Sequence, residues 1–373
     1  MSMSRITLRV VVIALALIGP YGQNVFGKVL VVGNCLGGTK YYSTIQSAVN
    51  ATASGDTVEV CPGTYPEQVS ITNPGVTGIT VKGIASGNRK AAVITVPTTG
   101  LLENGLYSAT PVPAQVYVTS VGVLLSDLIV DGTGAACFAV PTIGVLFHEV
   151  VSADLNADGG TVQHLVVRNE DACGPAGQPL AGQAIVSDGS FITIDANVIN
   201  NVDAYGIVGN GGKVQITSNI LSNNLGSGPL TGISLDPQAT GARVTGNQII
   251  GSPVGITGIS LDPQATGARV TGNQIFGSPV GISILNDNGD VIENNVVSSS
   301  EFGIIVNSSD NEVITSNKIA NSSQAALWLV NSDGNNSFQN EINEAPVGLL
   351  GFASAAPTDT FSNTYFNVQI IKE

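Results

Sequence analysis

The second half of the chain repeats a short pattern of polar and apolar positions at a nearly constant interval. An asparagine followed two positions later by an apolar residue recurs in steps of 22, 28, 26, 22, 22, 23 and 23 residues. A small residue followed by an aliphatic one recurs with the same period, from Gly206-Ile207 to Gly348-Leu349. Short strands joined by tight turns and stacked about 4.8 Å apart would give both markers one period. The asparagines are Asn197, Asn219, Asn247, Asn273, Asn295, Asn317, Asn340 and Asn363.

A direct duplication within this half supports a stacked architecture. Residues 231–256 and 257–282 are the same sequence apart from Ile250 and Phe276, and no linker separates them. A unit of 26 residues is too short to fold alone and must bury its apolar side against a copy of itself. We therefore expect much of the chain to be one stack of coils.

The repeated asparagines have a structural explanation. A side-chain amide in a turn can bond the equivalent amides of the coils above and below, and asparagine tolerates turn geometry. We therefore interpret the column as a structural ladder. The alternative, that these residues bind sugars, is less favoured.

The pattern before the first coils is typical of a helix. Ile45, Ala48 and Val49 share one face of a helix expected over residues 42–53, and Ser43 and Gln46 have the spacing of a capping box. A single amphipathic helix ahead of a β-stack is well placed to cover its open end, where strand edges would otherwise be unpaired.

The run YSTIQSAVNATASGDTVEVCPGTYPEQVSI, which contains this helix, resembles the opening of pectinesterase-like and other pectin-lyase-like proteins. The resemblance covers about thirty residues. It implies an all-β fold, a right-handed parallel β-helix or solenoid with an N-terminal capping helix.

The catalytic motifs of pectinesterases, polygalacturonases and pectate lyases are absent from the chain. The Leu-Asp-Pro-Gln at Asp236 and Asp262 resembles only part of the Asp-Pro-His-Asp of alginate epimerases and lacks its histidine. The resemblance therefore supplies no catalytic residue and leaves open whether the chain is an enzyme.

The first half carries the same pattern with longer steps. Leu128 and Leu165 stand in the ladder position, 37 residues apart, and Asn197 follows after 32. The excess residues must leave the coil as loops, which we expect around 98–115, 132–143, 150–160 and 169–181. We thus divide the chain into residues 1–27 and a β-helix domain of residues 28–373, with looped coils over 98–181 and regular coils over 185–365.

Residues 1–27 have the form of a secretory signal peptide. Arg5 and Arg9 precede an apolar run, and Val25-Phe26-Gly27 offers a cleavage site. The uncharged run is shorter than the roughly 20 residues that span a bilayer. We expect a secreted, periplasmic or cell-surface protein with no transmembrane anchor after signal removal.

The four cysteines make an even count in a chain that is expected to be exported. Pairing neighbours in sequence predicts the disulfides Cys35–Cys61 and Cys137–Cys173. Neither histidine stands at metal-ligand spacing from a cysteine, so no metal site of the zinc type is expected.

The net charge of −14 restricts the partners. It argues against nucleic acid and against an anionic membrane surface. It also disfavours an acidic polysaccharide unless a cation bridges the two. We expect no cofactor, with calcium left possible by the many carboxylates.

Aligning Leu128 with Leu165 brings charged residues into shared columns. Asp127 falls beside His164, and Asp131 falls beside Arg168. One hypothesis is a polysaccharide-processing cleft in which Asp127, Asp131, His164 and Arg168 are catalytic. The favoured alternative is charge pairing on a solvated face. Substrate-binding candidates near the loops are His148, Glu149, Glu170 and Asp171.

Three functions follow. The leading one is an exported β-helix protein that binds carbohydrate, either a polysaccharide or a surface glycan. The alternatives are a polysaccharide lyase, glycoside hydrolase or carbohydrate esterase, and a structural or adhesive solenoid without catalysis. Trp328, the single tryptophan, is either a sugar-stacking platform or a core residue between Leu327 and Leu329.

Overall fold

The computed structural model describes residues 27–37, 41–84, 91–107, 110–134, 142–149, 157–170, 182–222, 230–251, 256–352 and 363–368. The signal peptide expected over 1–27 lies outside this set except for Gly27. Cys137, Cys173 and Asp171 also lie outside it, as do most residues of the expected loops at 132–143, 150–160 and 169–181. No helix within the described ranges is long and apolar enough to cross a membrane.

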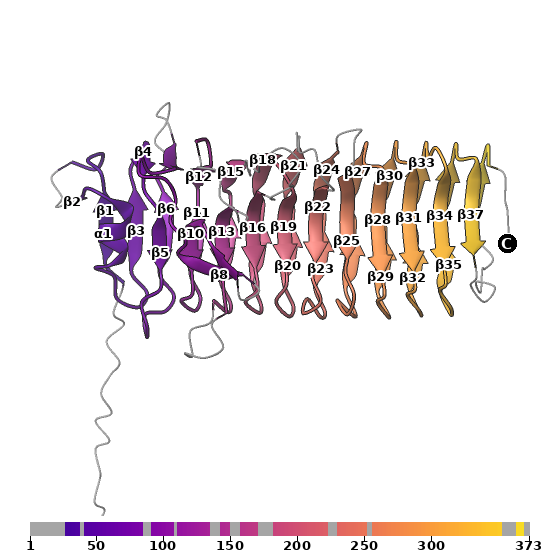
Figure 1. The fold of residues 1–373 in the computed structure, drawn as a ribbon, viewed down its shortest axis with the longest axis horizontal. Helices are drawn as coiled ribbons and strands as arrows, with labels where there is room; N and C mark the ends of the chain where they lie inside the picture. Colours follow the sequence, from indigo (N-terminus) through magenta and orange to yellow (C-terminus); the bar gives the residue numbers. More distant parts are fainter. Residues whose placement is uncertain are drawn as a thin grey trace, which may run out of the picture.

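The described strands form three long parallel sheets that run the length of the molecule (Figure 1). The chain visits sheet 1, sheet 2 and sheet 3 in turn and then climbs to the next coil. The strands of sheet 1, in sheet order, are β2 (Tyr41–Tyr42), β1 (Val29–Val32), β3 (Thr57–Val60), β6 (Thr80–Gly83), β11 (Leu124–Ser126), β14 (Thr161–Gln163), β17 (Thr193–Asp195), β20 (Gln215–Thr217), β23 (Arg243–Thr245), β26 (Arg269–Thr271), β29 (Val291–Glu293), β32 (Val313–Thr315) and β35 (Asn336–Phe338).

Sheets 2 and 3 complete each coil. Sheet 2 contains β4 (Gly63–Pro66), β7 (Ala92–Thr95), β12 (Leu128–Asp131), β15 (Val166–Glu170), β18 (Val198–Val202), β21 (Ile220–Ser222), β24 (Gln248–Ile250), β27 (Gln274–Phe276), β30 (Val296–Ser298), β33 (Lys318–Ala320), β36 (Glu341–Asn343) and β38 (Thr364–Phe366). Sheet 3 contains β5 (Val69–Ile71), β10 (Ala114–Val118), β13 (Ile143–Phe147), β16 (Gln183–Ser187), β19 (Tyr205–Gly209), β22 (Leu230–Leu235), β25 (Ile256–Leu261), β28 (Val280–Leu285), β31 (Phe302–Asn307), β34 (Ala325–Val330) and β37 (Val347–Phe352). The expected right-handed parallel β-helix is confirmed.

The core is a column of aliphatic side chains, one layer per coil. At the centre of sheet 1, Ile216, Val244, Val270 and Ile292 are each completely buried and lie in register with one another. Each such side chain contributes roughly 1.5–3 kcal/mol by leaving water. The period of the sequence therefore reflects the same buried positions recurring in every coil, with more than one in sheet 3, where Ile259 and Leu261 are both completely buried.

The asparagine ladder runs along the turn between sheets 1 and 2. The Nδ2 of Asn247 donates to the Oδ1 of Asn273 at 2.9 Å and to the backbone oxygen of Ile216 at 2.9 Å. The same contacts recur from Asn197 to Asn363. Leu165, in the ladder position of an earlier coil, donates its backbone N–H to the Oδ1 of Asn197. The structural interpretation of the column is confirmed.

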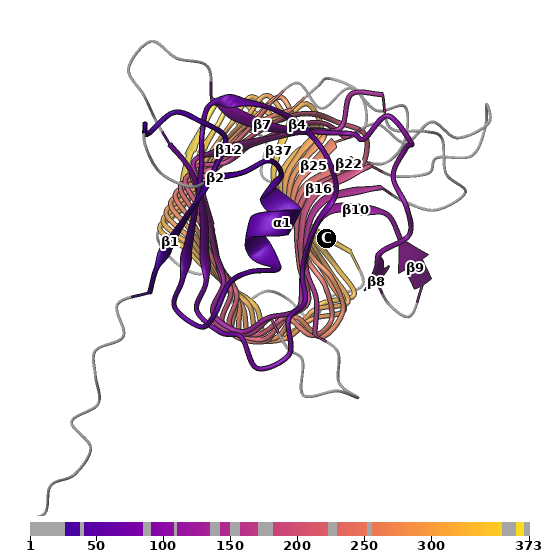
Figure 2. The same ribbon diagram turned by 90° about the vertical axis from the view of Figure 1, so that its left-hand side faces the viewer.

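The helix at the N-terminal end is shorter than expected. α1 spans Ile45–Val49 and lies across the open end of the stack (Figure 2). Thr44, not Ser43, is the N-cap, and its side chain accepts from the N–H of Ser47. The expected capping box is wrong, because Glu67 from the following coil already accepts from the N–H groups of Ile45 and Gln46.

Two further features belong to this end of the molecule. The expected disulfide Cys35–Cys61 is present, with an S–S distance of 2.00 Å. Part of the insertion predicted at 98–115 forms the antiparallel hairpin of β8 (Gly105–Tyr107) and β9 (Thr110–Val112), which stands outside the stack beside β10 (Figure 2). A side-chain carbon at Gly105 would lie 3.0 Å from the Tyr117 ring, so the hairpin covers part of the outer face of sheet 3.

Candidate functional site

Asp127 and His164 occupy equivalent turn positions between sheets 1 and 2. Both have left-handed backbone, with φ of 57° and 54°, and both side chains are about half exposed. The Nδ1 of His164 lies 3.8 Å from the Oδ1 of Asp127. The shared column predicted from the sequence is present, and it forms a loose, solvated pair.

Asp131 and Arg168 lie at the other end of the same two strands. They are in register in sheet 2, and the Nη2 of Arg168 lies 2.8 Å from the Oδ2 of Asp131. At about 3.3 Å per residue, Asp127 and Asp131 are about 13 Å apart along β12. Carboxylate pairs of glycosidases are about 5–10 Å apart, so these two aspartates do not form such a pair.

Asp131 is committed to a local network. Partial burial alone would raise the pKa of Asp131, but hydrogen bonds from Thr133, Asn169 and Arg168 lower it overall. The Nδ2 of Asn169 donates to its Oδ1 at 2.9 Å, and the Thr133 hydroxyl donates to the same atom at 2.6 Å. A carboxylate held in this way is a poor general acid, whereas the partly exposed Arg168 could contact an anionic group.

Glu170 lies inside the stack. It is completely buried, and neither carboxyl oxygen has a hydrogen-bond partner among the described residues. Its carboxyl group occupies the space beside Gly132 and Gly144, where an added side-chain carbon would lie 2.8 Å from Oε2 and 2.9 Å from Oε1, respectively. Burial, followed by the charge of Asp131, raises the pKa of Glu170 well above its usual value. The buried carboxyl group therefore favours its neutral form and is not exposed to a surface ligand.

His148 lies at a third corner of the coil, where sheet 3 leads into sheet 1. Its Nδ1 lies 2.6 Å from the Oδ2 of Asp188, and its ring stacks on Tyr117 with centroids 6.1 Å apart. The backbone N–H of Glu149 donates to the Oδ1 of Asp188. A carboxylate on Nδ1 orients an imidazole ring as in catalytic triads, so this pair could act as a base.

Asp188 was missed in the sequence, although a signal for it exists. The small-aliphatic marker also occurs at Gly144-Val145 and Ala184-Ile185. Aligning these two pairs places His148 directly beside Asp188, as the register of β13 and β16 confirms. The predicted site residues are therefore distributed over three corners of the coil and do not form one cleft.

A second polar group on sheet 3 follows the same column. Asp236 and Asp262 continue the row of His148 and Asp188 in the duplicated coils. The hydroxyl of Ser260 donates to the Oδ1 of Asp262 at 2.9 Å, and that of Ser234 to the Oδ1 of Asp236 at 3.2 Å. Burial, then the carboxylates of Asp262 and Asp236, raise the pKa of Tyr205, which begins β19 in register with Thr231.

The face of sheet 3 changes character along the stack. On the coils nearer the N-terminus this face is apolar and covered. Four of its outward side chains are at 7% exposure or less, namely Tyr117, Leu146, Val186 and Val208. From Ser234 onward its outward residues are smaller or half exposed. Among the described residues, no group of three or more His, Cys, Asp or Glu side chains could hold a metal ion.

The comparisons with known proteins agree with this fold. Residues 238–373 match the family model "Periplasmic copper-binding protein (NosD)". This segment contains no His, Cys or Met, the side chains that favour copper among biological metals. The matched residues therefore do not fit a copper site. No curated protein sequence matches the chain.

Several solved structures have the same architecture at low identity. The A-module of the mannuronan C-5 epimerase AlgE6 of Azotobacter vinelandii matches with a TM-score of 0.53 and 16% identity, over 88% of this chain and 94% of that one. A mannuronic-acid-specific family 6 polysaccharide lyase from human gut microbiota matches with 0.50 and 12% identity, over 93% and 92%. The Dettilon tailspike protein matches with 0.54 and 12%, over 92% of this chain and 62% of that one. These likenesses establish the fold.

Proposed function

We propose that the protein is an exported carbohydrate-binding protein whose ligand lies along the outer face of sheet 3. The observation that carries the proposal is the row formed by Asp236 and Asp262, with Ser234 and Ser260 donating to the two carboxylates, together with Tyr205 at the start of the neighbouring strand β19. Carboxylate oxygens are strong acceptors for sugar hydroxyls, and a phenol can both donate to them and accept from them. Because coils repeat about every 4.8 Å, a repeating polymer can meet the same contact more than once and gain avidity.

The class of ligand has independent support. Proteins of the same fold are described as mannuronan epimerases and a mannuronic-acid-specific lyase, and the partial family match is to a periplasmic protein. Both agree with a location outside the cytoplasm and with a polysaccharide or surface glycan as partner. We do not extend the named substrates to this chain, because its acidic face would repel polyuronates. We do not extend copper to it either, because the matched segment contains no His, Cys or Met.

A second candidate function is polysaccharide processing, and the His148–Asp188 pair favours it. Imidazole oriented by a carboxylate is a suitable base for proton abstraction or for activating a nucleophile. The originally expected group of Asp127, Asp131, His164 and Arg168 remains a hypothesis for the same function. A purely structural solenoid is the third candidate.

One experiment separates these candidates. The full chain is applied to a glycan array, and positive glycans are assayed for reducing ends and for unsaturated products. We expect binding without product, and we expect the double variant Asp236→Asn/Asp262→Asn to weaken binding by about tenfold, as loss of charged hydrogen bonds predicts. Asp195→Asn, on the outer face of sheet 1, is the matched control and should leave binding unchanged.

The other outcomes are equally informative. Product formation that His148→Asn abolishes would replace binding with catalysis as the function. Product that survives His148→Asn but is lost in Asp131→Asn would identify the originally expected group. Absence of binding to every glycan would contradict the proposal and favour the structural role.

A further inference from the structure

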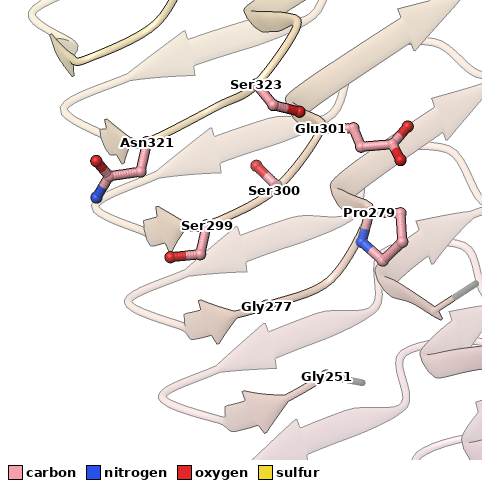
Figure 3. A pocket seen from close by; sticks show the side chains of 8 residues that line it. All are labelled: Gly251, Gly277, Pro279, Ser299, Ser300, Glu301, Asn321 and Ser323. Atoms are coloured by element: carbon pink, nitrogen blue, oxygen red, sulfur yellow. The ribbon is translucent and has the colours of Figure 1, made fainter. Parts of the chain in front are cut away.

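A hollow lies at the corner where sheet 2 leads into sheet 3, near the C-terminal end of the stack. It has a volume of about 440 Å³ and spans the turns after β24, β27, β30 and β33 (Figure 3). We call it the C-terminal groove. It is lined by Gly277, Pro279, Ser299, Glu301, Asn321 and Ser323, together with Gly251 and Ser300.

The groove exists because these turns are short and their residues are small. Three residues, 299–301, join β30 to β31, and three, 277–279, join β27 to β28. Gly277, Ser299 and Asn321 occupy equivalent positions with left-handed backbone, at φ of 71°, 59° and 55°. Successive turns therefore present similar surfaces, one per coil, as a repeating ligand requires.

The lining offers hydrogen-bonding groups with one negative charge and no positive charge. Ser299, Asn321 and Ser323 are exposed, as is Glu301, whose Oε2 accepts from Gln324 at 3.4 Å. Hydroxyl, amide and carboxylate groups can together accept from and donate to sugar hydroxyls. A uronate or sulfated sugar would instead meet Glu301 with like charge.

A buried hydroxyl lies beneath the groove. Ser278 is 1% exposed, and its Oγ has no hydrogen-bond partner among the described residues. The atom faces Gly251 in the groove lining, where an added side-chain carbon would lie only 2.6 Å away. A buried polar atom without a partner costs roughly 1–3 kcal/mol, and Ser278 itself is not among the residues that line the groove.

An aromatic surface continues from the groove onto sheet 3. Phe302 follows Glu301 directly and stacks on Trp328 of the next coil, with ring centroids 4.7 Å apart and an interplanar angle of 23°. Leu327 and Leu329 are 1% exposed and face the core, so Trp328 points outward. Ala325, in register with Phe302, leaves room for the indole. The alternative that Trp328 is a core residue is therefore wrong.

We propose that the C-terminal groove and the Phe302–Trp328 pair together bind an uncharged oligosaccharide. Sugar rings would pack against the aromatic surface, while their hydroxyls would reach Glu301 and the turn residues. The proposal rests on the carbohydrate-binding function and adds to it a separate subsite and a charge preference. The row of Asp236 and Asp262 follows the C-terminal ends of its strands in sheet 3, whereas this groove lies at the turns that lead into the sheet 3 strands, so the two can be tested with separate variants.

Trp328 reports directly on the groove because it is the only tryptophan. Neutral xylo-, cello-, malto- and manno-oligosaccharides and a charged oligomannuronate are titrated into the full chain while tryptophan emission is followed. We expect a saturable change with at least one neutral oligosaccharide and none with oligomannuronate. Calorimetry supplies the affinity independently of the fluorophore.

Variants then place the binding. Phe302→Ala and Glu301→Gln should each weaken binding of the neutral oligosaccharide by about tenfold, from lost stacking and lost charged hydrogen bonds. Phe191→Ala, an aromatic residue that is 56% exposed elsewhere on the stack, is the matched control and should have no effect. Unchanged circular dichroism and unfolding midpoints show that each variant is folded.

Three results would overturn the inference. If glycan binding is lost in Asp236→Asn/Asp262→Asn but unaffected in Phe302→Ala and Glu301→Gln, the proposed function stands and the groove plays no part. Preference for oligomannuronate would contradict the assigned charge class. If no glycan binds, both proposals fail together.

Discussion

At the scale of single residues, the ladder asparagines combine burial with a large number of hydrogen bonds. Asn295 is completely buried. Its Nδ2 donates to Val270 and Asn317, and its Oδ1 accepts from the backbone and side chain of Asn273. Asn294, its neighbour, is exposed in the left-handed position of the turn. Adjacent asparagines therefore have very different roles in stability.

This difference predicts the effects of two neighbouring substitutions. Asn295→Ala removes contacts to both adjacent coils and leaves buried backbone groups unpaired, which should lower the free energy of unfolding by about 2–4 kcal/mol. Asn294→Ala should cost at most about 1 kcal/mol, since Ala196 already occupies the equivalent position with φ of 54°. Urea unfolding of both variants measures the difference. Equal losses would show that the ladder adds nothing beyond turn geometry.

Charged residues on the outer face of sheet 1 pair between neighbouring strands. Arg243 and Arg269 are in register, as the duplication implies. Arg269 pairs with a carboxylate of the next strand, and its Nη2 lies 2.6 Å from the Oε1 of Glu293. Arg269 thus pairs with an oppositely charged residue of the neighbouring strand in sheet 1.

At the scale of elements, the turns that follow β28 and β31 bury carboxyl groups in a second ladder. The backbone N–H of Ala268 donates to Asp290, that of Asp290 to Glu312, and that of Glu312 to Asn335, at 2.7–2.8 Å. Asp290 and Glu312 are completely buried. The pKa of Asp290 is raised to about 9. Burial is the largest cause, and the charges of Glu312 and Asp287 raise the pKa further.

Glu312 is similarly perturbed. Burial, together with the nearby Asp287 and Asp310, raises its pKa to about 8 against opposing backbone hydrogen bonds. The pKa of Asp287 is itself raised, chiefly by burial and further by the charge of Asp262. All the ionisable groups named here are acidic, so none of them would stabilise the ionised form of its neighbours.

The pH dependence of stability follows from these shifts. The folded state keeps protons that the unfolded chain releases above pH about 4. The free energy of unfolding should therefore fall as pH rises from about 4 to 8–9, by up to about 1.4 kcal/mol per pH unit for each group. Glu312→Gln should flatten this decline, because Asn335 shows that an amide fits the column. Urea unfolding between pH 5 and 9 measures it.

The control and the contradicting result are clear. Glu341→Gln changes an exposed carboxylate that pairs with Lys318 and should leave the decline unchanged. Stability that increased with pH over this range would show that these carboxyl groups are ionised in the folded protein.

The same elements show what can be read from the sequence. Periodicity predicted the coils and the ladder, because the same buried positions recur in every coil, at steps of 22 to 28 residues in the second half of the chain. It did not predict that Glu67 caps α1 or that Asp188 pairs with His148. These contacts join residues 22 and 40 positions apart, across turns whose lengths vary. Aligning Gly144-Val145 with Ala184-Ile185 would have given the register of Asp188, whereas the contact of Glu67 with α1 depends on how the helix lies against the first coils.

At the scale of the whole molecule, each coil contacts chiefly the coils above and below it. The three sheets extend from the capping helix to β37 and β38 with no change of strand order (Figure 1). The candidate sites differ in whether they use repeated positions or particular coils. The row of Asp236 and Asp262 and the C-terminal groove each use residues of successive coils, whereas His148 and Asp188 require two particular coils whose loops lengthen the chain.

This architecture predicts that a whole coil can be removed. Deleting residues 231–256 joins Leu230 to Thr257. Strand β19 then pairs with β25 instead of β22. The residues that it contacts stay the same, because the two copies differ only at Ile250 and Phe276. We expect a folded protein with an unchanged type of circular dichroism spectrum, and a urea m-value reduced roughly in proportion to the surface lost. Deleting 231–243 instead removes part of a coil, breaks register in all three sheets and should give aggregated protein. If the whole-coil deletion aggregated as readily as the partial one, the stack would depend on contacts beyond nearest neighbours.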